Sequence, residues 1–145
     1  MVNKIQNKKD YKNNVNSDQL IEWLNYFIIK GNLSQLETRK ILSFILSLST
    51  NMNNKELMNL TISQFKELID NKSFIYESIN KRIEFIIDKP EKVIKILNKL
   101  PYLQQLLNKS KEEILLNTIG TNKPLSSSNL QKDINYIAMR ILLKN

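Results

Sequence analysis

Hydrophobic residues at helical spacing run through the chain from residue 17 onward, and this periodicity constrains the fold more than any other feature. In the first such segment, Leu20, Leu24, Phe27 and Ile28 fall on one stripe of a helix. No segment shows a convincing alternation of apolar and polar residues, which is the pattern of a half-buried strand. The sequence therefore predicts an all-α fold with no β-sheet.

Polar motifs, prolines and glycines mark where the predicted helices begin and end. Three pairs have the spacing of a capping box: Ser34 with Glu37, Thr61 with Gln64, and Ser110 with Glu113. Gly31 is expected to end the first helix in the left-handed conformation. First-turn prolines are expected at Pro90 and Pro101, and Ser128 is expected to cap the last helix.

These signals predict helices at about 18–30, after Ser34, after Thr61, after Ser73, at 90–99, 102–108 and 110–120, and from Ser128 onward. They amount to an irregular bundle of about six to eight helices, which we expect to form a single domain over residues 17–145. Residues 1–16 contain four lysines, one acidic residue and almost no apolar periodicity, so they are expected to form a mobile basic arm. The alternative is a tail without a function.

The residue types exclude most kinds of chemistry. The chain has no cysteine and no histidine, which removes disulfides, thiolate metal sites and the side chain that most often moves protons near pH 7. It has two glycines, too few for a phosphate-cradling loop. Glu84 and Asp88 share a helix face without a third ligand. We therefore expect a protein that is not an enzyme and that holds no cofactor or metal.

The longest strongly apolar segment, residues 20–29, is far short of the roughly 20 residues that a membrane-spanning helix needs. No stretch near the start resembles a signal peptide. A soluble, intracellular and cytoplasmic protein is the simplest expectation.

The net charge of +8 favours a polyanion as partner, either a nucleic acid or an anionic membrane surface. Part of this charge can come from codon usage, because 20 Asn, 20 Ile and many Lys are typical of an AT-rich coding sequence. The clearest basic feature is a row of lysines on one face of the predicted 90–99 helix and one step before it: Lys89, Lys92, Lys95 and Lys99. The alternative interpretation of this row is an ordinary solvated helix face.

Residues 60–83 raise a second possibility, a helix-turn-helix whose second helix would present Lys81 and Arg82 to DNA. The turn would lie at Asp70–Lys72. Several features favour ordinary bundle packing instead, above all an apolar stripe that continues through Ile86 and Ile87 and makes the second helix long.

Two functions therefore remain open. The first is a non-enzymatic nucleic-acid-binding or nucleoprotein-accessory protein that uses a basic helical face. The alternative is a helical interaction module, for example a viral or plasmid-borne inhibitor or adaptor, that binds a protein partner through an apolar groove. A contiguous basic face would favour the first and an exposed apolar patch the second. The sequence leaves the partner and the oligomeric state open.

Overall fold

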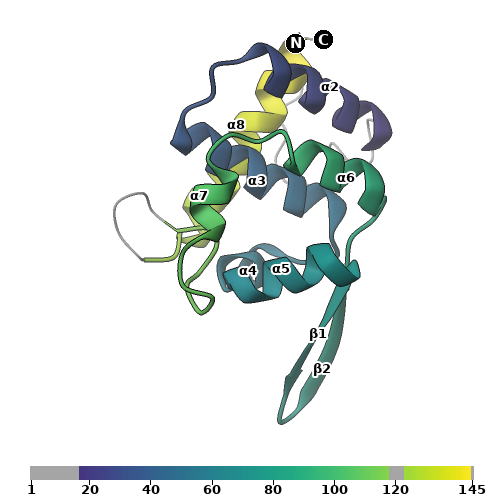
Figure 1. Ribbon diagram of the computed structural model, residues 1–145, viewed down its shortest axis with the longest axis vertical. Helices are drawn as coiled ribbons and strands as arrows, with labels where there is room; N and C mark the ends of the chain where they lie inside the picture. The colour runs from purple at the N-terminus through teal and green to yellow at the C-terminus, as the bar shows by residue number, and fades with distance from the viewer. Residues whose placement is uncertain (1–16, 118–122, 145) are drawn as a thin grey trace.

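The computed structural model describes residues 17–117 and 123–144, in which seven helices surround a common core and one β-hairpin projects from it (Figure 1). The elements are α2 (Ser17–Lys30), α3 (Gln35–Ser49), α4 (Asn54–Met58), α5 (Ile62–Asn71), β1 (Ser73–Ser78), β2 (Lys81–Ile86), α6 (Pro90–Leu97), α7 (Leu103–Leu107) and α8 (Ser127–Lys144). The predicted arm at residues 1–16 lies outside the described residues.

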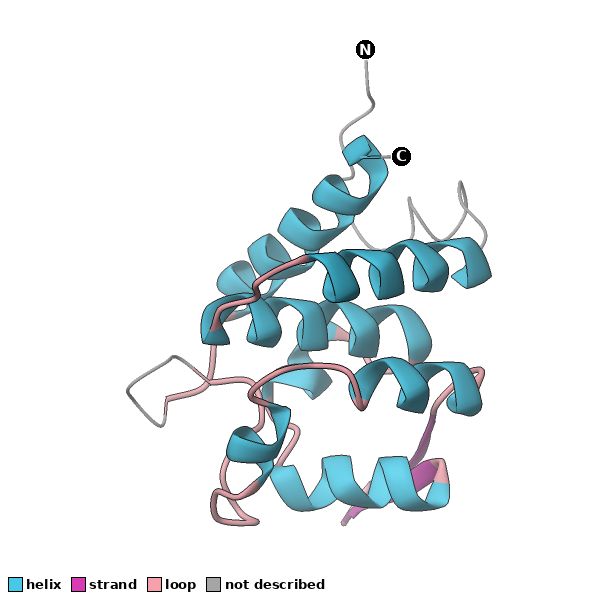
Figure 2. Cartoon of the chain, turned by 45° about the horizontal axis from the view of Figure 1, so that its top comes forward, coloured by secondary structure: helices cyan, strands magenta, loops and turns pink. Residues whose placement is uncertain are grey.

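Helix α3 lies at the centre of the core. Every residue from 41 to 50 is buried, and α8, α4 and α6 all contact this helix (Figure 2). Three of the buried hydroxyl groups here are satisfied locally, since Ser43, Ser49 and Thr50 donate to the carbonyl oxygens four residues earlier at 3.0, 2.6 and 2.6 Å, whereas Ser47 Oγ has no partner among the described residues. A helix buried on all sides can therefore carry Ser and Thr without leaving these three hydroxyls unsatisfied.

A buried ion pair joins α3 to α8. The Arg39 guanidinium donates to Asp133 Oδ2 from Nε at 3.2 Å and from Nη2 at 2.9 Å. Its Nη1 donates to the carbonyl oxygen of Asn117 at 3.5 Å. The two side chains are only 11% and 9% exposed, so solvent screens this pair little.

A second, more exposed contact between the same helices involves the capping box at the start of α3. Glu37 accepts from the Ser34 backbone N–H at 3.1 Å and pairs with Arg140 of α8 at 3.3 Å. The Ser34 backbone hydrogen bond, followed by the Ser34 hydroxyl and Arg140, holds the pKa of the Glu37 carboxyl below its ordinary value of 4.5. Because the folded-state pKa is lowered, this contribution to stability is present above that ordinary value and is lost as the pH falls.

Several predicted helix starts are confirmed. The boxes at Ser34 and Thr61 both form, and Pro90 begins α6. A further box, Asn53 with Glu56, starts α4 and was not predicted. Gly31 ends α2, but its φ lies outside the left-handed range, so that part of the prediction is wrong.

The prediction of a helix after Ser110 is also wrong for residues 110–117, the part of this segment that the structure describes. Residues 110–117 form turns and isolated bridges instead. This segment runs beside residues 60–63, with hydrogen bonds from Leu115 N to Leu60 O at 2.8 Å and from Ile62 N to Glu113 O at 2.9 Å. Backbone pairing with a distant segment therefore replaces the helical hydrogen bonds.

The prediction of an all-α fold with no β-sheet is wrong, because β1 and β2 pair as an antiparallel hairpin in place of the helix expected after Ser73. Lys72 adopts a left-handed conformation with φ 65° and ends α5. The residues that follow are rich in aromatic and β-branched types, which favour extended structure. Phe74 and Phe85 pair across the strands with ring centroids 5.1 Å apart, and both are buried at the base of the hairpin.

The buried ion pair generates a stability prediction. Replacing Asp133 with Leu leaves the Arg39 charge buried without its carboxylate, so the free energy of unfolding should fall by about 3 to 5 kcal/mol. The double variant Arg39→Met/Asp133→Leu removes both charges and should be more stable than the Asp133→Leu single variant. Urea unfolding followed by circular dichroism measures both changes. A double variant whose loss equals the sum of the two single losses would contradict this account.

Candidate functional site

The lysine row predicted at residues 89–99 lies on and beside α6. Val93, Ile96 and Leu97 bury one side of this helix in the core, so Lys92 and Lys95 lie exposed on the other side. The remaining two lysines flank the helix. Lys89 is half-buried and precedes it in a left-handed conformation with φ 52°, and Lys99 is exposed in the turn that follows. The helix is thus shorter than predicted, and only two of the four lysines belong to it.

Helix α2 contributes a polar contact to this surface. The Lys99 ammonium donates to Asn25 Oδ1 at 2.9 Å, which holds the charge beside α2. The next residue of α2, Tyr26, is 61% exposed. Phe27 is buried instead, with the Arg140 guanidinium 4.8 Å from its ring centroid. We define the lysine ridge as Lys92, Lys95 and Lys99, with Lys89 at its start.

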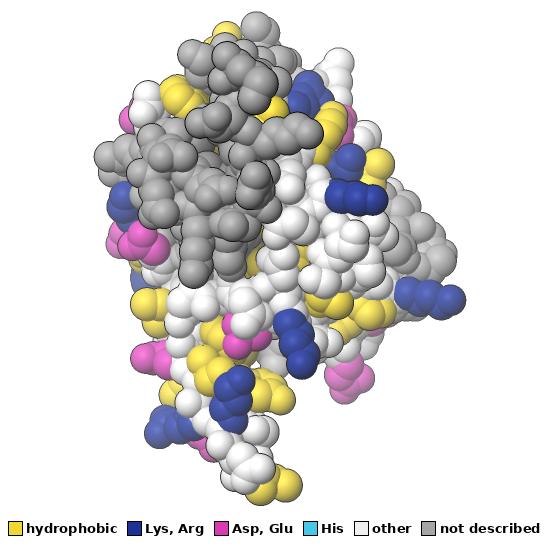
Figure 3. Space-filling view, turned by 180° about the vertical axis from the view of Figure 1, so that it is seen from behind, with side chains coloured by type: hydrophobic (Ala, Val, Ile, Leu, Met, Phe, Trp, Pro, Cys, Tyr) yellow, Lys and Arg dark blue, Asp and Glu magenta, His cyan; other side chains and the backbone are white. Residues whose placement is uncertain are grey.

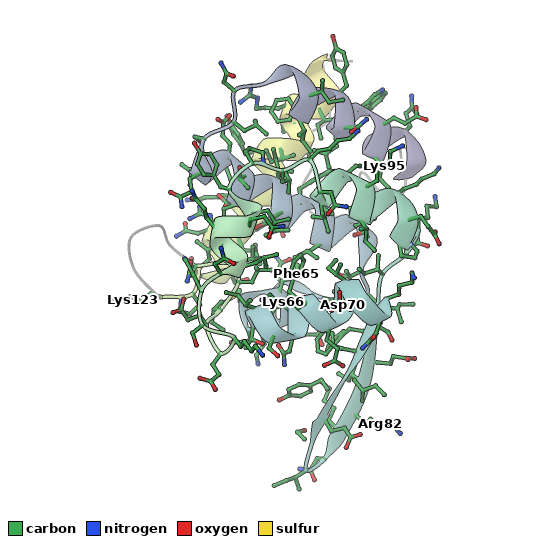
Figure 4. The ribbon with its side chains drawn as sticks, viewed as in Figure 1. Phe65, Lys66, Asp70, Arg82, Lys95 and Lys123 are labelled. Carbon is green, nitrogen blue, oxygen red and sulfur yellow. The ribbon has the colours of Figure 1, made fainter. Side chains whose placement is uncertain are left out.

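Lys81 and Arg82 do not join the lysine ridge. Both lie on β2, where successive side chains point to opposite faces of the hairpin. Lys81 faces α4, whereas Arg82 lies on the outer face and pairs with Glu77 at 3.3 Å. Figure 4 shows Arg82 far along the hairpin and Lys95 on α6. The helix-turn-helix interpretation of these two residues is therefore wrong, because no second helix carries them.

A hollow of about 290 Å³ separates the inner face of the hairpin from α4 and the start of α5. Its apolar lining comes mainly from Met52, Phe74, Tyr76, Ile83 and Phe85. Hydrophobic side chains also lie at the tip of the hairpin and around its base, with charged side chains among them (Figure 3). A partly apolar groove is therefore present, and the hairpin forms one of its sides.

Asn51, a residue that no sequence motif marks, holds the outer edge of β2. Its side-chain amide donates to Glu84 O at 3.0 Å and accepts from the Ile86 backbone N–H at 2.9 Å. Next to it, the Asp88 backbone N–H donates to Ser49 O at 2.6 Å. The end of α3 therefore completes the β2 edge. No local signal could have revealed this contact, because its partners lie more than 30 residues further along the chain.

Within residues 17–117 and 123–144, no group of three or more Asp and Glu residues is placed to hold a metal ion. No helix in the same residues is long and apolar enough to span a membrane. No known protein family, curated protein or solved structure is significantly similar to this chain.

The Asn51 contact can be tested by replacing Asn51 with Leu, which keeps the size of the side chain but removes both hydrogen bonds. The Ile86 amide should lose its protection against hydrogen exchange. The free energy of unfolding should fall by about 0.5 to 1.5 kcal/mol for each of the two lost hydrogen bonds. The Phe85 amide is the internal control, since its N–H points toward β1 and should stay protected. Unchanged exchange at Ile86, measured by NMR, would contradict the assigned contact.

Proposed function

We propose that this protein is a non-enzymatic nucleic-acid-binding protein that contacts backbone phosphates through the lysine ridge. The observation that carries the proposal is the two-sided character of α6, whose apolar side is buried while Lys92 and Lys95 are exposed. Burial of the apolar side fixes the direction in which these two lysines point. Glu91 is the one acidic residue between Lys89 and Lys99.

The spacing of the lysines suits a phosphate backbone. Lys92 and Lys95 are separated by about 4.5 Å along the helix axis, at about 1.5 Å per residue. Every nucleotide of a strand carries one phosphate charge, so neighbouring cations can meet neighbouring phosphates. The Asn25 contact with Lys99 adds a third cation whose position is restrained, so less side-chain entropy is lost when it meets a phosphate.

Tyr26 favours single-stranded over double-stranded nucleic acid. Its side chain is 61% exposed and follows Asn25, the residue of α2 that contacts Lys99. An unpaired base can stack on such a ring, whereas a base inside a duplex cannot. The recognition we propose is therefore electrostatic contact with the backbone plus stacking, without readout of base edges and without strong sequence preference.

The lysine ridge generates a prediction about salt dependence. Changing Lys92, Lys95 and Lys99 together to Gln should weaken binding to single-stranded oligonucleotides of different sequence by similar factors. The slope of log affinity against log salt should become shallower by about 2 to 3, since each lost phosphate contact removes about 0.7 to 0.9. Fluorescence anisotropy across a salt series measures both quantities.

The matched control changes three exposed lysines elsewhere, Lys55, Lys111 and Lys132, to Gln. This variant has the same net charge as the ridge variant, so it separates a local site from general attraction. Equal losses in the two triple variants, or no loss in the ridge variant, would contradict the proposed function. Circular dichroism should show unchanged helix content in both.

A second candidate function, binding of a protein partner, is favoured by a separate observation. Large apolar side chains are exposed along the hairpin: Ile75 44%, Tyr76 44%, Ile79 101% and Ile86 46%. Together with the apolar groove beside α4, they make the hairpin the part of the described surface best suited to a protein contact.

A further inference from the structure

The two outer edges of the hairpin differ in their hydrogen bonding. On β2, Asn51 occupies the backbone groups of Glu84 and Ile86, so these groups point away from β1. In an antiparallel pair, residues directly opposite each other both point their backbone groups inward or both outward. Glu84 lies opposite Ile75 and Ile86 lies opposite Ser73, so Ile75 and Ser73 also point outward. Glu77, two residues beyond Ile75, also points its backbone N–H and C=O groups outward.

The outer edge of β1 is consequently open in the described part of the chain. The described residues supply no hydrogen-bond partner for the outward backbone groups of Ile75 and Glu77. An open edge is a template for another strand, and proteins usually protect such edges with lysine, proline or a covering segment. β1 contains no lysine or proline; its exposed apolar side chains are Ile75 and Tyr76, both 44% exposed, and its one charged residue, Glu77, pairs with Arg82 across the hairpin. A hairpin of two strands is also marginally stable by itself.

We propose that a second copy of this chain pairs with the open edge, β1 against β1 in antiparallel orientation, to form a four-stranded sheet across a twofold axis at Ile75. In this register Ile75 faces its own copy, and Ser73 faces Glu77 on the same side of the sheet. On the other side of the sheet, Phe74 of each copy faces Tyr76 of the other copy. All outward backbone groups between Ser73 and Glu77 then find partners, and apolar side chains face only apolar side chains.

The side chains select this register over its neighbours. An axis at Tyr76 would place Ile75 opposite Glu77, an apolar group against a carboxylate. An axis at Glu77 would place two carboxylates directly opposite each other, which is unfavourable. An axis at Phe74 would bring Tyr76 opposite Lys72, beyond the end of the strand. The chain is thus complementary to itself in one register. This inference does not rest on the proposed function, because the lysine ridge lies on a different element.

The test exploits the fact that Ile75 faces its own copy in the proposed dimer. Analytical ultracentrifugation should show that the parent protein forms a dimer as its concentration rises. Ile75→Lys and Ile75→Glu should each be monomeric, because like charges would meet at the axis. An equal mixture of the two should form a heterodimer, because opposite charges would then meet. Formation of the heterodimer in the mixture also shows that neither variant is simply unfolded.

Ile86 supplies the matched control. It lies on the same outer face of the hairpin and is 46% exposed, but its strand edge is occupied by Asn51. Ile86→Lys and Ile86→Glu should dimerise as the parent does. The proposal is overturned if the parent stays monomeric at the highest soluble concentration, or if the Ile75 variants still dimerise alone. It is equally overturned if the Ile86 variants lose the dimer, or if the mixture of Ile75 variants does not associate.

Discussion

The complete burial of residues 41–49 of α3 is the constraint on which the other elements depend. Most of its buried polar side chains meet this constraint by hydrogen bonding within the helix or through the Arg39–Asp133 ion pair with α8, and Ser47 Oγ is the exception, without a partner among the described residues. A buried ion pair contributes less to net stability than its Coulomb energy suggests, because both ions lose their hydration. It does disfavour packing in which either charge is buried alone, and so favours one arrangement of α3 against α8.

Both proposed binding surfaces begin where α3 ends. Ser49 and Asn51 hold the base of the hairpin through Asp88, Glu84 and Ile86, and α6 starts directly afterward at Pro90. The hairpin projects from the helical core, whereas α6 lies against the core (Figure 1). Lys92 and Lys95 of α6 are exposed. One anchoring point therefore supports an edge suited to another strand and a basic ridge suited to phosphate. In a β1–β1 dimer, each complex would carry two ridges, which would raise the avidity for a long nucleic acid.

Local sequence signals predicted the structural features that depend on neighbouring residues. They failed where contacts between distant segments determine the structure. The boxes at Ser34 and Thr61 and the first-turn Pro90 act within one helical turn, so their helices could be predicted. The hairpin could not, because its isoleucines at 75, 79 and 83 also match a helical stripe, and outward-facing Ile86 hides the alternation of β2. The two-residue turn at Ile79–Asn80 contains no glycine and neither residue has positive φ, so the usual hairpin signal is missing. Helical spacing predicted the exposed positions of Lys92 and Lys95, but it also placed Lys99 on the helix, which ends earlier, at Leu97. The Asn25 contact of Lys99 and the Asn51 edge contact join segments far apart in the chain.

Amide hydrogen exchange along residues 73–78, measured by NMR in dilute and concentrated solutions of the parent protein, tests the central claim that this segment is an edge strand with one open side. The account predicts that the Phe74 and Tyr76 amides are protected at both concentrations because they point toward β2. The Ile75 and Glu77 amides should exchange freely in dilute solution and become protected only as the dimer forms. Uniform protection of consecutive amides at every concentration, the pattern of a helix, would contradict it.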